Sequence, residues 1–254
     1  MTDPQSSAAQ SAVPPPTALA ALTEIGGVLE SMEQLSDYLD GVVHVVRRHV
    51  SGCDEVGVTI LSEGRPQTVA YTTVQTLQID AVQYALDDGP CLDAARNRRE
   101  NRVGDLVADA RWPRFAAQCR EDGMRSLLAL PLRSGKECVG AMNLYGWAPY
   151  GFDAFDASLV RVAASRCADA VVAVSALDGA QRLAAQLEQA LASRAVIEQA
   201  KGVIMALRGV PEHEAFELLR TMSQRRNIKV RELAEQVVTG VVTREEPGRA
   251  SALP

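Results

Sequence analysis

Apolar residues recur at helical spacing near the start of the chain and then alternate in short runs typical of strands. Residues 17–50 have the helical pattern, interrupted near Gly26 and Gly27, which predicts two helices. Two β-rich runs follow, 55–61 and 67–74, and the turn-forming sequence EGRP separates them. This arrangement predicts a β-hairpin.

Shorter elements continue the mixed pattern through the middle of the chain. We expect one helix over 77–86, ended by the DDGP turn, and another that begins near Cys91. Residues 125–147 predict a second hairpin, which turns at Ser-Gly-Lys 134–136. Pro131 falls in its first strand, where proline is tolerated only at an edge or a bulge. Helices and hairpins in this order predict an α+β fold with an antiparallel sheet.

A long helix is predicted from Phe152 to Arg208, because the segment has no proline and only two glycines. Its length favours a connector or a coiled coil. A stripe with alternating spacings of four and three residues would face a partner helix for about three heptads. The stripe consists of Leu183, Leu187, Ala190, Arg194, Ile197, Lys201 and Ile204. We expect a homodimer through the helix 153–208, with packing of the helix on its own domain as the alternative.

Two shorter helices are predicted after Gly209, which can end the long helix in the left-handed conformation. Pro211 suits the first turn of the next helix. The residues expected to be buried by that helix are Ala215, Leu218, Leu219 and Met222. A break at 225–227 precedes the last helix, whose apolar face consists of Val230, Leu233, Ala234 and Val237.

These patterns divide the chain into a mixed domain at 17–178 and a helical domain at 179–243. The flanking segments 1–16 and 244–254 have little to bury and are expected to be disordered.

Charge is distributed unevenly along the chain. The formal net charge is −6, but residues 181–244 hold ten Lys and Arg against seven Glu, a net charge of +3. No run reaches the roughly 18 apolar residues of a membrane span, and the first residues lack the pattern of a secretion signal. We therefore expect a cytoplasmic protein. Five scattered cysteines without a C-x-x-C pair indicate reduced thiols and no metal site.

Residues 193–238 read SRAVIEQAKGVIMALRGVPEHEAFELLRTMSQRRNIKVRELAEQVV. This stretch closely resembles the ANTAR domain, a three-helix RNA-binding module of bacterial antitermination regulators. The matching positions are Ser193, Arg194, Ile197, Ala200, Lys201, Gly202, Met205, Gly209, Ala215, Phe216, Leu219, Arg220, Ser223, Asn227, Leu233 and Ala234. The resemblance implies binding to paired stem-loops in nascent RNA, which prevents a neighbouring terminator from forming.

The apolar members of this pattern are expected to form a small core, and the polar members an RNA-binding surface. The expected core residues are Ile197, Met205, Phe216, Leu219, Leu233 and Ala234. The candidate RNA-binding residues are Arg194, Lys201, Arg220, Ser223, Gln224, Arg226, Asn227 and Lys229. Arginine and lysine can neutralise phosphates, and Asn and Gln can bind the edges of unstacked bases. The alternative is an ordinary solvated helix face, and Lys201 could also serve an acidic partner.

Four motifs in the first domain are LDDGPCLDAARN at 86–97, WPRF at 112–115, LALPLRSGKECVGAMNLY at 128–145 and FDAFD at 152–156. Together they resemble the GAF domain. The resemblance implies that a small ligand binds between one face of the sheet and a roof formed by residues 75–123. We predict no cofactor apart from such an unidentified small ligand.

Cys91 is the one residue of this roof with obvious reactivity. It follows Gly89 and Pro90 at a predicted helix start, where the helix dipole favours a thiolate, although neighbouring aspartates oppose it. We interpret Cys91 as a buried, inert thiol. The alternative is a thiol-based redox enzyme or sensor, for which Cys119 is the candidate resolving thiol.

The sequence therefore predicts a regulator without catalytic activity, in which a GAF domain senses a small molecule or redox signal and an ANTAR domain binds RNA. A protein-docking sensor that binds no RNA is the further alternative.

Overall fold

The computed structural model describes residues 20, 22–23, 27–120, 122–153 and 157–242. The chain forms two compact units, Met1–Asp178 and Gly179–Pro254. The predicted disordered tails lie outside the described residues. Of the first predicted helix, only Ala20, Leu22 and Thr23 are described, and they are helical.

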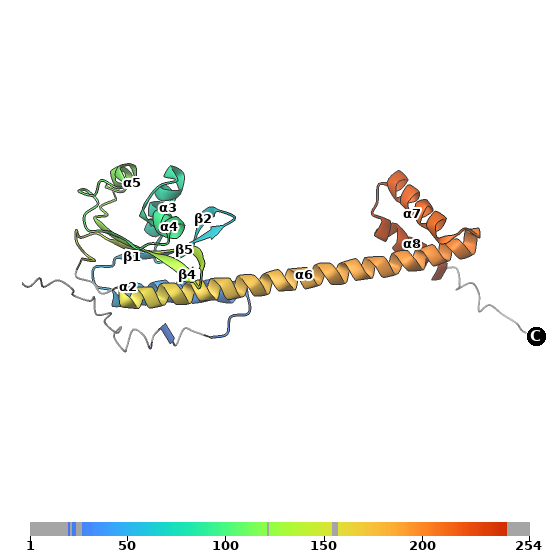
Figure 1. Cartoon of the computed structure of the whole chain (residues 1–254), viewed down its shortest axis with the longest axis horizontal. Helices are drawn as coiled ribbons and strands as arrows, with labels where there is room; N and C mark the ends of the chain where they lie inside the picture. Colours follow the sequence, from blue (N-terminus) through green and yellow to red (C-terminus); the bar gives the residue numbers. More distant parts are fainter. Residues whose placement is uncertain (1–19, 21, 24–26, 121, 154–156, 243–254) are drawn as a thin grey trace, which may run out of the picture. The chain divides into compact units, whose positions relative to one another are not determined.

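The first unit is built on an antiparallel sheet of five strands in the order β2-β1-β5-β4-β3. Figure 1 labels β1, β2, β4 and β5 of this sheet. The strands are β1 (Glu55–Ser62), β2 (Arg65–Tyr71), β3 (Asn101–Val103), β4 (Ser126–Ser134) and β5 (Glu137–Gly146). Both predicted hairpins are confirmed. Glu63 and Gly64 connect β1 to β2 with φ angles of 51° and 77°, the left-handed backbone that a two-residue hairpin turn requires.

Helices cover both faces of this sheet. The elements are α2 (Met32–His49), α3 (Val74–Leu86), α4 (Pro90–Asn97), α5 (Pro113–Cys119) and α6 (Ser158–Arg208). Helix α2 and the first part of α6 pack on one face against residues such as Leu130 and Met142. Helices α3, α4 and α5 pack on the other face against Ala129 and Tyr145. The alternation of inward residues along β4 and β5 follows the two-residue period of a strand.

Pro131 shows how the edge of the sheet is formed. Although β4 lies between β5 and β3 in the strand order, β3 pairs only with Leu127, Leu128 and Ala129. Past Ala129 the outer side of β4 has no neighbouring strand among the described residues. Pro131 lies in this stretch without a neighbouring strand, as its missing N–H requires.

The long helix begins later than predicted. Helix α6 has 51 residues, from Ser158 to Arg208, whereas the sequence pattern placed its start at Phe152. Phe152 instead lies in a turn with its side chain fully buried in the core beneath α2 and α6. Its apolar character therefore reflects tertiary packing and not a helical face.

The second unit consists of the last part of α6, α7 (Glu212–Arg226) and α8 (Val230–Val242). Its buried residues are Ala200, Ile204, Ala215, Leu219, Leu233 and Ala234. Gly209 ends α6 with a φ angle of 64°, as predicted. Pro211 is the residue before α7 and not part of its first turn.

One expected core residue of this unit is not in the core. Phe216 is 38% exposed, because it lies beside, and not within, the stripe of α7 that holds Ala215 and Leu219. No helix in the described part of the chain is long and apolar enough to span a membrane.

Candidate functional site

Polar and basic side chains gather around the turn between α7 and α8. Arg220, Gln224, Arg226, Asn227 and Lys229 are exposed there, and we call these five residues the α7–α8 surface. Arg194, on α6, is also exposed. The remaining candidates, Lys201 and Ser223, are 8% and 6% exposed.

The backbone of the turn is fixed by hydrogen bonds. Asn227 adopts the left-handed conformation, with φ at 51°. Its N–H donates to the Gln224 carbonyl at 3.2 Å, and the Ile228 N–H donates to the Ser223 carbonyl at 3.2 Å, which is the Schellman arrangement at a helix end. The Ser223 hydroxyl donates to the Ile228 carbonyl. Ser223 therefore positions the turn and leaves contact with a ligand to its exposed neighbours.

Arg220 has a weak partner on its own helix. Its Nη2 lies 2.7 Å from Oε2 of Glu217, and both side chains are 54% exposed. An exposed pair at this spacing stabilises a helix by only about 0.3–0.5 kcal/mol. The Arg220 guanidinium can therefore exchange Glu217 for a phosphate at little cost.

Lys201 is held inside the unit. Its Nζ lies 2.7 Å from Oε2 of Glu198 and 2.6 Å from Oε1 of Glu212. These hydrogen bonds raise the pKa of Lys201, and the pKa of Glu212 is lowered by the same contact. Lys201 thus ties α6 to the first turn of α7, and this contact favours a structural role over direct contact with RNA.

Phe216 adds an aromatic side chain to the same side of α7. Phe216, Arg220 and Gln224 are spaced four residues apart, so they form one ridge along the helix, and Asn227 continues it. All four are exposed. Sequence reasoning assigned Phe216 to the core because it is apolar. Ala215 and Leu219 form the buried face of α7. Phe216 directly follows Ala215 in the sequence, and this neighbouring position was the signal that Phe216 faces outward.

A second cluster of polar groups lies between the sheet and the helices α3 and α4 of the first unit. We call it the Asp80 cluster, and it consists of Thr59, Thr68, Asp80, Gln83, Tyr84, Cys91, Asn143 and Tyr145. Asp80, Gln83 and Asn143 are fully buried. Except for Cys91, sequence reasoning missed these residues, although Asn143 follows the inward alternation of Ala141 and Tyr145.

Asp80 is the acidic centre of this cluster. Tyr145 donates to its Oδ1, Thr68 donates to its Oδ2 at 2.8 Å, and the Asn143 amide lies 3.3 Å from Oδ1. Burial raises the pKa of Asp80 to about 6, while the hydrogen bonds from Tyr145, Thr68 and Asn143 act in the opposite direction. Gly57 permits the close approach of α3, because a Cβ there would lie 3.1 Å from Oδ2 of Asp80.

Cys91 lies in the first turn of α4, as predicted, and is fully buried. Its Sγ lies 3.4 Å from the Thr59 hydroxyl and accepts from Nδ2 of Asn143 at 3.0 Å. Burial, followed by the charge of Asp80, raises the pKa of Cys91 to about 12. Desolvation thus outweighs the helix dipole, and the thiolate needed for redox chemistry is disfavoured. Burial also raises the pKa of Cys119 to about 12.

One polar atom of the Asp80 cluster has no partner in the described structure. Oδ1 of Asn143 is buried and accepts no hydrogen bond. An orphaned buried acceptor costs about 1–3 kcal/mol, which makes this atom the natural contact for a bound donor group.

Comparison with family models assigns both units. Residues 33–172 match the model of the GAF domain, and residues 185–238 match the model of the ANTAR domain. The chain belongs to the GAF family and carries an ANTAR domain. This combination of domains is regulatory. No curated protein matches the chain. Among the described residues, no group of three or more His, Cys, Asp or Glu side chains could hold a metal ion.

Two solved structures with TM-scores above 0.5 share the GAF fold. The GAF domain of a phosphoenolpyruvate-protein phosphotransferase from Acinetobacter is 18% identical, with a TM-score of 0.52 over 63% of this chain and 93% of that chain. The corresponding domain from Coxiella burnetii is 15% identical, with a TM-score of 0.51 over 65% and 95%. A free methionine-R-sulfoxide reductase from Thermoplasma acidophilum is 16% identical, with a TM-score of 0.45 over 55% and 93%.

Proposed function

We propose that this protein is a homodimeric RNA-binding regulator of transcription termination, whose GAF domain responds to a small molecule. The observation that carries the proposal is the ANTAR match at 185–238 together with the exposed polar and basic residues of the α7–α8 surface. Proteins with this domain prevent terminator formation by holding paired stem-loops of the nascent transcript.

The α7–α8 surface supplies the chemistry that recognition of a loop requires. Arg220, Arg226 and Lys229 neutralise phosphates, which gives affinity without sequence preference. Gln224 and Asn227 have both donors and acceptors for the edges of unstacked bases. The turn fixed by Ser223 holds these groups in place before RNA arrives, which lowers the entropic cost of binding.

A second copy of the chain is the proposed partner of α6. Leu183, Leu187 and Leu191 are 56%, 57% and 68% exposed on the helix. Leu183 and Leu187 belong to the stripe with four-three spacing, and Leu191 lies next to it. The last part of the stripe, from Ile197 to Ile204, packs within the second unit, so the proposed seam is limited to the earlier part. Two copies of the ANTAR domain match the two stem-loops of the proposed target.

The Asp80 cluster is the proposed ligand site of the GAF domain. Oδ1 of Asn143 has no hydrogen-bond donor in the described structure. Asp80, whose pKa is raised to about 6, accepts a proton or a cationic hydrogen-bond donor near neutral pH. A polar ligand with an N–H or O–H group would satisfy both. Its entry requires α3 and α4 to move outward, which is the conformational change that a sensor needs.

Crosslinking in cells followed by sequencing of the attached RNA would identify the targets, and a gel-shift assay with one such RNA would test the site. We expect Arg226→Gln combined with Lys229→Gln to weaken binding at least tenfold, since each phosphate contact is lost. The matched control is Arg65→Gln combined with Arg114→Gln, both exposed in the GAF domain, with affinity unchanged.

Two results would contradict the proposal. One is crosslinking that recovers no RNA above the level of a control protein. The other is equal RNA affinity for wild type and the Arg226/Lys229 variant. Recovery of a protein in place of RNA would support the alternative of a protein-docking sensor.

A further inference from the structure

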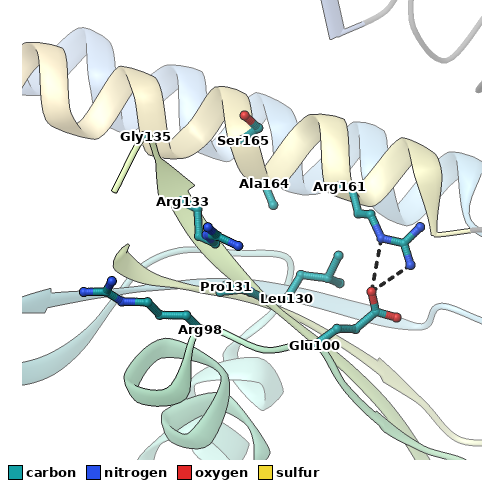
Figure 2. Close-up of a pocket in the computed structure, with 9 residues that line it drawn as sticks. All are labelled: Arg98, Glu100, Leu130, Pro131, Arg133, Gly135, Arg161, Ala164 and Ser165. Carbon is teal, nitrogen blue, oxygen red and sulfur yellow. Dashed lines mark hydrogen bonds and ion pairs between the residues drawn. The ribbon is translucent and has the colours of Figure 1, made fainter. Parts of the chain in front are cut away.

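A pocket of about 390 Å³ opens at the edge of the sheet, apart from the Asp80 cluster. It lies between the part of β4 that has no neighbouring strand and the first part of α6, with the end of α4 on its other side (Figure 2). The pocket is open here because the pairing of β3 with β4 ends at Asn101 and Ala129, and no strand among the described residues lies beyond that pair. Its size falls within the range of small-molecule sites, about 300–1,000 Å³.

The pocket is strongly cationic. Arg98, Arg133 and Arg161 line it, and Glu100 is the one carboxylate among the lining residues. Glu100 is already neutralised, because its Oε2 lies 2.8 Å from Nη2 of Arg161 and its Oε1 lies 3.4 Å from Nη2 of Arg102. A local excess of positive charge therefore remains at Arg98 and Arg133.

The guanidinium groups of these two arginines have neither a hydrogen bond nor an ion pair in the described part of the chain. Figure 2 shows Arg133 extending between β4 and α6, and Arg98 on the side of the pocket away from the Arg161–Glu100 pair. Asp169 accepts a hydrogen bond from Ser134 at 2.6 Å and forms no ion pair with either arginine in the described part of the chain. The two guanidinium groups, with ten N–H donors between them, thus belong to one pocket, although Arg98 points away from Arg133 in Figure 2.

The backbone of Arg98 supports a functional assignment. Arg98 ends α4 in the left-handed conformation, with φ at 57°. Glycine or asparagine is the usual residue there, and an ordinary side chain costs about 1–2 kcal/mol in this conformation. Such strain tends to persist where the side chain is used.

The floor of the pocket is apolar. Leu130 and Pro131 from β4 and Ala164 from α6 line it, and Figure 2 shows the Ala164 side chain directed toward Leu130. We propose that this pocket binds a small organic anion, a carboxylate or phosphate ester whose charged group contacts Arg98 and Arg133 and whose apolar part lies on Leu130 and Pro131. The site is independent of the RNA-binding surface and of the Asp80 cluster.

Such a ligand would bridge three elements of the GAF domain. Arg98 ends α4, Arg133 belongs to β4, and Ala164 of the apolar floor belongs to α6. Bound anion would therefore fasten the start of α6 to the sheet, and would stabilise the folded domain in proportion to its concentration.

Phenyl phosphate is a suitable probe, because it joins a dianion to an apolar ring. We expect isothermal titration calorimetry on the full chain to show binding of phenyl phosphate, weaker binding of inorganic phosphate and no binding of phenol. Arg133→Gln and Arg98→Gln should each reduce the affinity for phenyl phosphate about tenfold, the loss of a charge-assisted hydrogen bond. Arg65→Gln, an exposed arginine outside the pocket, should leave it unchanged.

The titrations show whether phenyl phosphate binds in this pocket or elsewhere on the protein. Absence of phenyl phosphate binding to wild type overturns the proposal. Equal affinity of wild type and both arginine variants also overturns it, because the probe then binds elsewhere. Both arginines are exposed, so the variants should fold, and the melting temperature without ligand verifies this. If one variant unfolds, the other decides the question.

Discussion

Asp80 makes the stability of the GAF domain depend on pH. Its burial raises its pKa from 3.8 to about 6, so the folded chain holds the proton more tightly than the unfolded chain does. The contribution of Asp80 is therefore most favourable below about pH 4, and it declines as the pH rises through about 6. A shift of this size corresponds to roughly 3 kcal/mol.

Asp80→Asn should remove this dependence. We expect the free energy of unfolding of the variant, relative to wild type, to rise by roughly 2–3 kcal/mol between about pH 4 and about pH 7. Urea denaturation at a series of pH values measures it, with Asp37→Asn on the exposed side of α2 as the control. Parallel curves for wild type and Asp80→Asn would show that Asp80 titrates normally.

Phe216 is the second residue with a distinct expected effect. If it stacks on a loop base, Phe216→Ala should weaken RNA binding by about 1–3 kcal/mol. Phe216→Tyr retains a stacking ring and should bind nearly as wild type does. Gel shift measures affinity, and circular dichroism checks that helical content is unchanged. If Phe216→Ala binds RNA with the affinity of wild type, Phe216 does not contact RNA and serves in packing, for example against a second copy of the chain.

The residue scale also shows where sequence reasoning fails. Lys201 and Ser223 belong to the ANTAR pattern and were grouped with the RNA-binding candidates. Helical spacing reveals the pairing of Lys201 with Glu198, but the contact with Glu212 depends on how the chain turns at Gly209. Likewise, the hydrogen bond of Ser223 to Ile228 exists only once the turn has formed. Family patterns identify important positions without distinguishing contact from support.

At the scale of elements, the local patterns were sufficient for most of the fold. Both hairpins, the short helices at 77–86 and near Cys91, and the two last helices were predicted because turn residues and periodicity agree there. The start of α6 was not predicted correctly, because Phe152 fits the apolar spacing of a helix but is buried by tertiary contacts outside α6. The Asp80 cluster was also not predictable as a unit, because it joins β1, β2, α3, α4 and β5 across the fold.

The exposed leucines of α6 lead to a prediction about assembly. Leu187→Glu places a charge in the proposed seam and should raise the dissociation constant of the dimer by at least about tenfold, given the roughly 2 kcal/mol of a buried leucine. Ala185→Glu adds the same charge on the opposite side of the helix and should have no effect. Analytical ultracentrifugation distinguishes them. A wild-type chain that is monomeric with RNA bound would refute the coiled-coil interpretation.

At the scale of the whole molecule, charge is separated between the two ends of the sequence. Residues 181–244 have a net charge of +3, while the chain as a whole has a charge of −6. The rest of the chain, outside residues 181–244, therefore has a net negative charge and repels a polyanion such as RNA. A net negative protein can still bind RNA because attraction is set by the local charge within a Debye length, about 8 Å at physiological salt.

This separation predicts how RNA binding responds to salt. Phosphate contacts release counterions, so log K should fall linearly with log salt concentration, despite the net charge of −6. Lys229→Gln should reduce the magnitude of that slope by about 1, because one phosphate contact is lost, whereas Arg65→Gln in the GAF domain should leave it unchanged. Fluorescence anisotropy with a labelled double stem-loop at several salt concentrations gives the slopes. If Lys229→Gln does not change the slope, Lys229 contacts no phosphate. A slope of zero would mean that the protein binds RNA through base contacts alone.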